Sequence, residues 1–388
     1  MIIARMSDFE RVCMELKTCE VTQLIEMSES RDFVCIGIGK CFERFLDICS
    51  QYNIQKSIIA LCDNEKKKWG QNLLIGDSTL PIIPVEHIEK LIENNYVIII
   101  TCYSAQGIVE QLSKLEGVSY RECYYFPMTY SMELDKIMYS KEVPGELRIE
   151  REPLIPKKIH YCWFGKNEIP RKNKIWMESW KKLCPDYEII EWNESNYDIA
   201  ACEYMQKAYE SKKWGFVSDY ARLDVIYRYG GIYLDTDVEL VKNLDELLYQ
   251  RAFCGFESLG RVAFGLGFGC EAEYPLLTEM MDKYKKMEFI CKEGKVYSEV
   301  STAFQTRCLE EKGLIVNGTY QIVDGMTIYP TQVLCGKSGY TRRIMDTENT
   351  FCIHHYDASW VDEEKKTQID MIENLQKQSF SLTDFQLL

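Results

Sequence analysis

The chain has 388 residues, 46% of them hydrophobic, which is enough for one large domain or two medium ones with their own buried cores. Its 60 acidic residues outnumber its 46 basic residues, and the formal net charge is -14. This balance argues against a protein that binds nucleic acid or anionic membranes through bulk positive charge. We expect two domains and no nucleic-acid partner.

Targeting and redox signals are weak throughout the chain. No stretch approaches the roughly 20 apolar residues of a membrane-spanning helix, and YVIIIT at 96–101 has the length of a buried strand. The N-terminal segment lacks the basic and apolar regions of a signal peptide. The 17 cysteines are spread singly without a C-x-x-C pair, which favours reduced, buried thiols. We therefore expect a cytoplasmic protein without a transmembrane segment.

The first part of the chain alternates strand and helix patterns. Runs rich in β-branched residues are separated by segments with helical periodicity, which is typical of a parallel sheet with crossover helices. We predict an α/β protein whose residues 1–140 form a small Rossmann-like, parallel-sheet domain. The patterns are DFVCIGIGK (32–40), CFERFLDICSQY (41–52), SIIALCDN (57–64), VEHIEKLIENN (85–95) and YVIIITC (96–102).

Two glycines mark the turn between the first of these strands and the helix that follows. Gly37 and Gly39 stand there, and Asp63 ends the next strand, as in a nucleotide-binding fingerprint. Phe42 occupies the place of the third glycine. The pattern is compatible with a nucleotide site and equally with a tight strand-to-helix turn that binds nothing.

A boundary follows near 140–156, where SKEVPGELRIEREPLIP is charged and contains prolines. A new strand begins with KKIHYCWFG, and we expect the second domain to occupy residues 155–361. The remaining residues, 362–388, are predicted to form a polar C-terminal helix or tail with a solvated face.

Two carboxylates stand out in the second domain. WGFVSDYARLDVIYRY (214–229) has helical spacing and is stopped by two glycines, after which IYLD predicts a strand. Asp235 and Asp237 come at its end, and residues two apart in an extended chain point the same way. Such a pair can hold a hard divalent cation that neutralises a pyrophosphate. Two acids in a solvated turn are the alternative.

The surrounding residues carry a family resemblance. SDYARLDVIYRYGGIYLDTD (218–237) resembles the S-D-x-x-R-x-x-x-L-x-x-x-G-G-x-Y-x-D-x-D motif of retaining sugar-nucleotide transferases with the GT-A fold, in particular glycosyltransferase family 32. Ile226 replaces the leucine. IPKKIHYCWFGKNEIP (155–170) is similar to the family's opening strand, and CIHHYDASW (352–360) to its closing motif. The resemblance thus covers residues 155–360 and implies a GT-A domain.

The resemblance also implies roles for individual residues. Asp219 and Arg222 would hold the donor's sugar and ribose, although one helical turn apart they could be only an ion pair. One of the two histidines would complete a Mn²⁺ or Mg²⁺ site with the two acids. The expected catalytic residues are Asp219, Arg222, Asp235 and Asp237; the expected metal ligands are Asp235, Asp237, His354 and His355.

The remaining implied contacts are to the donor. Trp163 and the backbone at Cys162 would hold the base, with a core tryptophan as the alternative. Tyr233 would contact the sugar or phosphate, and Ser359 and Trp360 would close over the diphosphate. The segment STAFQTR (301–307) lacks the T-G-P-like loop of many relatives. Acceptor contacts are therefore not carried over.

These features predict a retaining, metal-dependent transfer of a hexose from a nucleoside diphosphate sugar, with UDP-hexose favoured. The acceptor would be a glycan or a lipid-linked saccharide, in bacterial capsular or exopolysaccharide synthesis with peripheral association to membrane-bound machinery. Three alternatives remain: a non-catalytic nucleotide-sugar sensor, a glycoside hydrolase that uses paired acids, and an oxidoreductase built on the first domain.

Overall fold

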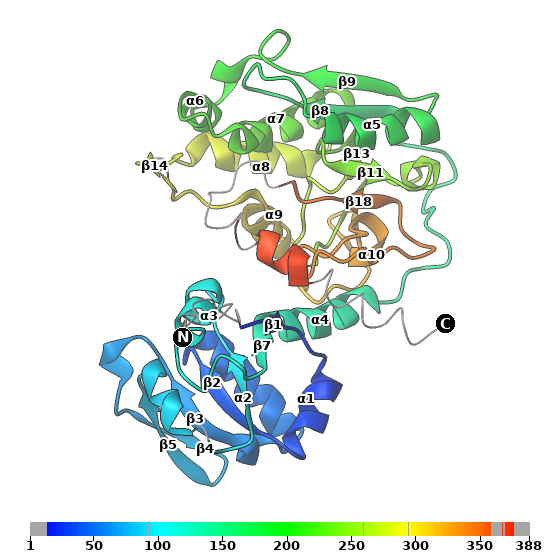
Figure 1. Ribbon diagram of the computed structural model, residues 1–388. Coiled ribbons are helices and arrows are strands. Elements are labelled where there is room, and N and C mark those ends of the chain that lie inside the picture. The colour runs from blue at the N-terminus through cyan, green and yellow to red at the C-terminus, as the bar shows by residue number, and fades with distance from the viewer. Residues whose placement is uncertain are drawn as a thin grey trace, which may run out of the picture. The chain divides into compact units, whose positions relative to one another are not determined.

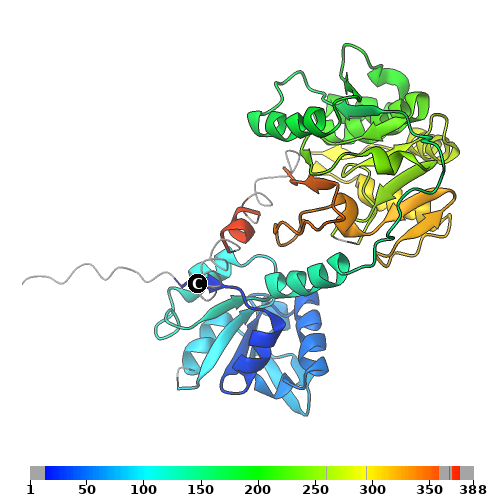
Figure 2. The same cartoon turned by 90° about the vertical axis from the view of Figure 1, so that its right-hand side faces the viewer.

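The computed structural model describes residues 14–91, 93–258, 260–293, 295–357, 367 and 369–375. These residues divide into two compact units (Figures 1 and 2). The first unit contains the described residues up to Leu134 and those from Thr367 onward. The second unit contains the described residues from Asp135 to Asp357. The division lies a few residues before the expected end of the first domain, and the predicted domain bounds stay a prediction.

The first unit is a mostly parallel sheet with the strand order β1-β7-β6-β2-β3-β5-β4. All neighbouring pairs are parallel except β4 with β5. Its strands are β1 (Leu16–Lys17), β2 (Asp32–Ile36), β3 (Ile58–Cys62), β4 (Asn72–Ile75), β5 (Ser78–Ile83), β6 (Tyr96–Ile100) and β7 (Cys123–Tyr125). Its α-helices are α1 (Val21–Ser28), α2 (Lys40–Gln51), α3 (Gln106–Leu112) and the start of α4 (Phe126–Tyr139). The short 3₁₀ helices are η1 (Gln55–Ser57), η2 (Lys66–Lys68) and η3 (Val85–Leu91).

Helices cover both faces of this sheet. Alternate residues of the central strands point to opposite faces, so Phe33 packs under α1 and α2, whereas Val34 packs under η3 and α3. The near-continuous apolar runs predicted as strands are therefore buried on both sides. The segment 85–95 is predicted to be helical, and in its described part the residues Val85–Leu91 form the 3₁₀ helix η3.

The second unit holds a mixed seven-stranded sheet with the order β16-β17-β12-β13-β10-β8-β9. The strands of the unit are β8 (Lys158–Cys162), β9 (Glu188–Trp192), β10 (Gly231–Tyr233), β11 (Val238–Leu240), β12 (Ala252–Gly255), β13 (Phe268–Cys270), β14 (Cys291–Lys292), β15 (Lys295–Val296), β16 (Gln321–Val323), β17 (Met326–Tyr329) and β18 (Cys352–His354). Its α-helices are α5 (Arg171–Leu183), α6 (Glu203–Glu210), α7 (Trp214–Tyr229), α8 (Pro275–Lys286), α9 (Ser301–Glu310) and α10 (Thr331–Leu334). Two 3₁₀ helices, η4 (Ile199–Ala201) and η5 (Asp245–Leu248), complete it.

Two layers sandwich the large sheet of the second unit. Helices α6, α7, α8 and α9 pack on one face, and α5, α10 and the two-stranded β11–β18 sheet pack on the other (Figure 1). Both units thus combine helices with sheets that contain parallel strands, and the predicted α/β class is confirmed. Among the described residues, no helix is both long and apolar enough to cross a membrane.

The helix that leads to the two acids begins and ends where the sequence predicts. Helix α7 covers 214–229, and Gly230 and Gly231 follow with φ of 62° and 108°, a region that favours glycine. A Cβ on Gly231 would lie 2.9 Å from the carbonyl oxygen of Lys158. The turn therefore needs glycine both for its backbone conformation and for the close approach of β10 to β8.

The charged segment before β8 packs on the second unit. The amides of Ile149 and Leu154 donate to the carbonyls of Tyr249 and Leu248. The last turn of α4 belongs to this unit too, because Tyr139 is buried and its hydroxyl donates to the carbonyl of Cys335 over 2.8 Å. Its folded core therefore extends upstream of residue 140.

This packing predicts different outcomes for two truncations. A chain that starts at Asp135 is expected to fold, whereas one that starts at Glu142 loses the buried Tyr139 and should be less stable by roughly 3 kcal/mol. Urea unfolding of the two truncated chains measures the difference. Equal stability would show that the end of α4 contributes nothing to the second unit.

Candidate active site

The two acids follow the central strand β10, which pairs with β8 on one side and β13 on the other. Beyond Tyr233 the chain leaves the sheet and turns, with the amide of Val238 donating to the carbonyl of Asp235 over 3.1 Å. The side chain of Asn173 in α5 donates to the hydroxyl of Thr236 over 3.1 Å. These two hydrogen bonds hold the turn that carries the acids.

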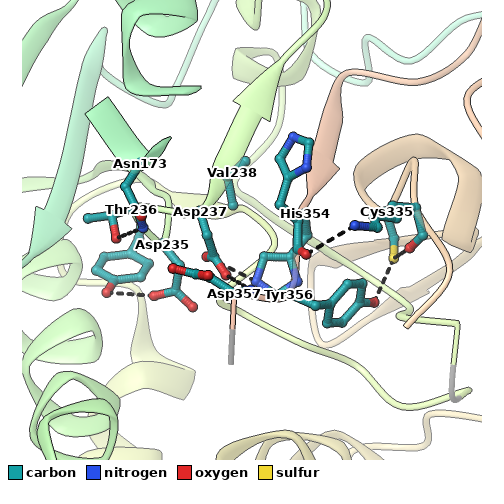
Figure 3. A network of polar contacts seen from close by, with 12 residues as sticks. Asn173, Asp235, Thr236, Asp237, Val238, Cys335, His354, Tyr356 and Asp357 are labelled. Atoms are coloured by element: carbon teal, nitrogen blue, oxygen red, sulfur yellow. Dashed lines mark hydrogen bonds and ion pairs between the residues drawn. The ribbon is translucent and has the colours of Figure 1, made fainter. Parts of the chain in front are cut away.

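A second strand pairing brings a histidine to these acids. Strands β11 and β18 are antiparallel, and Val238 lies opposite His354. Figure 3 shows His354 pointing toward Asp237, and the two side chains are 3.2 Å apart. One ligand atom each of Asp235, Asp237 and His354 lies within 4.8 Å of the others. These three residues form the candidate metal cluster.

The neighbouring His355 points elsewhere. Its ring stacks on Trp176 of α5 at 4.1 Å, and its Nε2 contacts Glu239 at 2.8 Å. His354 is the last residue of β18 and pairs with Val238, whereas His355 follows the strand and its amide donates to the carbonyl of Asp237 over 2.9 Å. Of the two histidines predicted as ligands, the structure brings His354 to the cluster and places His355 outside it.

The electrostatics of the cluster suit a cation. Burial opposes ionisation of Asp237, but the charge and hydrogen bond of His354 and the amide of Asp357 together lower its pKa to about 2. Asp237 and Asp235 in turn raise the pKa of His354 against the effect of burial. The Nε2 atom of His354 faces Asp237, whereas its buried Nδ1 has no hydrogen-bond partner among the described residues. Two carboxylates and an imidazole nitrogen directed at them are a suitable donor set for Mn²⁺.

Behind Asp235 lies a buried charge network. The guanidinium of Arg222 is 3.3 Å from Asp219 and 3.4 Å from Asp235, and it lies over the Tyr233 ring at 4.9 Å. The Tyr233 hydroxyl donates to Asp235 over 3.0 Å. Burial raises the pKa of Asp219 to about 6, and Asp235 adds to this rise while Arg222 opposes it. The sequence-predicted Asp219, Arg222, Tyr233 and Asp235 thus form one connected group.

Strand β8 ends at the same edge of the sheet as β10, the strand that precedes the two acids. Strands β8 and β10 are parallel, and His160 pairs with Tyr233, so the end of β8 at Cys162 and the following Trp163 lie at the edge where Asp235 follows β10. The thiol of Cys162 is buried, whereas Trp163 is half-buried and its indole N–H donates to the carbonyl of Asn167. His160 itself is a core residue that accepts from the indole of Trp192 and donates to the carbonyl of Gly230.

One residue that the sequence analysis missed supports Asp235 from behind. The amide of Asp235 donates to the carbonyl of Gly265 over 3.1 Å, and a Cβ on Gly265 would overlap the Asp235 carboxylate. The loop around Gly265 is held by α9, where Gln305 and Thr306 accept from the amides of Phe264 and Val262. The only signal in the sequence is the glycine-rich string FGLGFG at 264–269.

Alanine at position 265 is therefore expected to displace the Asp235 carboxylate. We expect Gly265→Ala to weaken Mn²⁺ binding by roughly tenfold or more, because displaced ligands lose coordination geometry. Gly145→Ala is the control, since its Cβ would enter open space. Titration with Mn²⁺ followed by calorimetry measures both, and unchanged affinity in Gly265→Ala would contradict the role assigned to this glycine.

Known proteins resemble this part of the chain. Residues 170–254 match the family described as a glycosyltransferase sugar-binding region containing a DXD motif. The match includes Asp219, Arg222, Asp235 and Asp237 and ends with β12. This part of the chain is thus similar to a glycosyltransferase sugar-binding region. Two of the predicted donor contacts, Ser359 and Trp360, lie outside both this region and the described residues.

The curated relatives of the chain include two mannosyltransferases. The chain is 31% identical over 170 residues to inositol phosphoceramide mannosyltransferase 3 of Schizosaccharomyces pombe. The aligned segment covers 42% of this chain and 46% of that protein. It is 34% identical over 105 residues to inositol phosphoceramide mannosyltransferase 2 of the same organism, covering 26% of this chain and 30% of that protein. The chain thus spans less than half the length of these relatives.

A solved structure, PaToxG glycosyltransferase, matches with a TM-score of 0.34 and 18% identity, over 48% of this chain and 78% of that one.

The remaining sequence-predicted residues, Gly37, Gly39 and Asp63, belong to the first unit, where they line a separate cleft.

Proposed function

We propose that the second unit is a GT-A glycosyltransferase that moves a hexose from a nucleoside diphosphate sugar to a saccharide or lipid-linked acceptor, with metal dependence and retention of the anomeric configuration. The observation that carries this proposal is the cluster in which Asp235 and Asp237 of the matched region meet His354, which lies outside that region. Two strand-end acids and an imidazole are what a cation bound to a diphosphate requires, whereas a solvated turn would not need a buried histidine.

Some of these residues would act on the diphosphate of the donor and others on its sugar. A Mn²⁺ or Mg²⁺ ion held by Asp235, Asp237 and His354 would neutralise the negative charge that develops on the leaving diphosphate. Arg222 would orient Asp235, since its guanidinium lies 3.4 Å from that carboxylate. Asp219, which belongs to the same network, would accept hydrogen bonds from hydroxyl groups of the donor.

The transfer itself exchanges one bond at the anomeric carbon. The bond from this carbon to the diphosphate oxygen breaks, the acceptor oxygen bonds to the same face, and the acceptor proton passes to the departing phosphate oxygen. No side chain becomes covalently attached to the sugar. The protein contributes by electrostatic preorganisation around the leaving group.

The base of the donor would lie at the adjoining strand end. Trp163 is half-buried there, with its ring edge fixed by the hydrogen bond to Asn167 and its backbone amide bonded to Trp192. A fixed and partly exposed indole is suited to stacking on a base such as uracil, and we therefore favour UDP-hexose. Ser359 and Trp360 remain proposed contacts to the diphosphate.

The relatives' names help to choose substrates for testing. They are mannosyltransferases that act on a lipid acceptor, inositol phosphoceramide, so GDP-mannose and lipid-linked acceptors belong beside UDP-glucose and free saccharides. A role in capsular or exopolysaccharide synthesis at the membrane stays a proposal. The cytoplasmic location expected from the sequence stays a prediction.

A thermal-shift screen of nucleoside diphosphate sugars tests the proposal. A donor that binds only the native state raises the melting temperature, and roughly 100-fold excess over the dissociation constant corresponds to about 2.7 kcal/mol. We expect one donor to stabilise the protein with Mn²⁺ and much less with a chelator. Release of nucleoside diphosphate from that donor should then be measurable.

Two outcomes would favour the rival functions. Metal-dependent donor binding without turnover, across a broad panel of acceptors, would indicate a nucleotide-sugar sensor. Cleavage of simple glycosides without any nucleotide would indicate a glycoside hydrolase.

A further inference from the structure

A second ligand cleft lies in the first unit. It has a volume of about 730 Å³, within the range of sites for small molecules and cofactors. Its walls come from the loops that follow β2, β3 and β6. Strand β2 lies between β3 and β6, so the connections diverge there, and open α/β sheets bind ligands at such a point.

One end of the cleft is suited to an anion. Helix α2 starts after Gly39, and among the described residues no side chain caps it and no atom lies within 4 Å of a Cβ placed on Gly39. The first amides of this helix are therefore open to the cleft, and the side chain of Lys40 is exposed beside them. Free amides and an ammonium group together are a phosphate-binding arrangement.

The loop after β6 supplies a flat surface. Tyr103 lines the cleft and is 50% exposed. Arg44 donates to its hydroxyl over 3.1 Å, and Tyr125 donates to its backbone carbonyl over 3.1 Å. Gly107 lies in the same wall, and a Cβ on it would also meet open space. A held aromatic face next to open space is suited to stacking on a base.

Asp63 does not have the free carboxylate that a nucleotide-binding fingerprint requires. Its carboxylate accepts from the amides of Ile38 and Glu65, each over 2.8 Å, and from the ammonium of Lys68 over 2.9 Å. In dinucleotide-binding folds the equivalent acid is free to hold the ribose hydroxyls. Here it fastens the glycine loop to η2, and Phe42 fills the core at the third glycine position.

We infer that this cleft binds a nucleoside diphosphate, free or as part of a nucleoside diphosphate sugar, with its phosphates at the start of α2 and its base against Tyr103. A dinucleotide such as NAD is not the ligand, because Asp63 is already engaged. The site is separate from the metal cluster and needs no metal. The inference stands independently of the proposed transferase function.

Calorimetry on the full-length protein in EDTA tests this site while the metal cluster is empty. The probes are UDP, GDP, UDP-glucose, GDP-mannose, NAD⁺ and inorganic pyrophosphate. We expect at least one of the first four to bind, and the comparison of each diphosphate with its sugar identifies the source of the ligand. Tighter binding of NAD⁺, or equal binding of pyrophosphate, would overturn the nucleoside diphosphate assignment.

Position 39 offers a matched pair of variants. In Gly39→Asp the new carboxylate would cap α2 and occupy the anion position, so the fold is retained and binding should fall by roughly tenfold or more. Gly39→Ala adds a Cβ in open space and should bind within about threefold of the parent, because the amides remain accessible. Equal affinity of the two variants would overturn the inference.

Hydrogen exchange locates the bound nucleotide. Protection by the tightest probe in EDTA should appear in peptides that contain residues 37–45 and 101–108. Protection confined to peptides of the second unit would show that the nucleotide binds there, and the cleft would not be its site. The fold of Gly39→Asp is checked by the same exchange pattern without ligand.

Discussion

Replacing Asp237 by alanine is expected to reduce metal-dependent cleavage of the donor by roughly a hundredfold or more, because the change removes a ligand of the cation. The fold should be retained. Asp237 contributes no apolar surface to the core, and without its charge His354 loses the interaction that raises its pKa, so the ring can stay neutral. Nucleotide release at saturating Mn²⁺ measures the effect, and melting temperature monitors the fold.

The two histidines provide the matched control for this experiment. His354→Ala should lower Mn²⁺ affinity as Asp237→Ala does, whereas His355→Ala removes only the contacts to Trp176 and Glu239. Activity of Asp237→Ala equal to that of the parent would remove the metal assignment. Loss of metal binding in His355→Ala alone would mean that the wrong histidine had been chosen.

Replacing Arg222 by methionine is expected to destabilise the second unit by about 3–5 kcal/mol, because it leaves buried carboxylates without their counter-charge. Its side chain is 6% exposed, as is that of Asp219, and Asp235 is the second partner. Urea unfolding followed by fluorescence measures the change. Adding Asp219→Asn to Arg222→Met should recover part of the loss, since one of the uncompensated charges is removed.

Arg228 in the same helix is the control for this prediction. It pairs with Asp224 at 2.6 Å, but its side chain is 41% exposed, so Arg228→Met should cost no more than about 1 kcal/mol. If Arg222→Met and Arg228→Met lower the free energy of unfolding by similar amounts, burial of the Arg222 network does not add to stability.

Local signals in the sequence were sufficient for much of the fold. The helix at 214–229, its stop at two glycines and the strands at 32–36, 58–62 and 96–100 follow from periodicity and backbone chemistry within a few residues. The segment 85–95 shows the limit of periodicity, because an amphipathic spacing does not separate an α-helix from a 3₁₀ helix of one or two turns.

The sequence by itself determined the α/β class and the two acids at a strand end, because these depend on residues close together in the chain. The selection of His354 over His355 depends on the pairing of β18 with β11, more than a hundred residues apart. The same holds for Gly265 behind Asp235, and for Asp63, whose partner Ile38 lies on another strand's loop. Only the tertiary structure decided these points, because side-chain direction and close backbone approach are set by strand register and packing between distant segments.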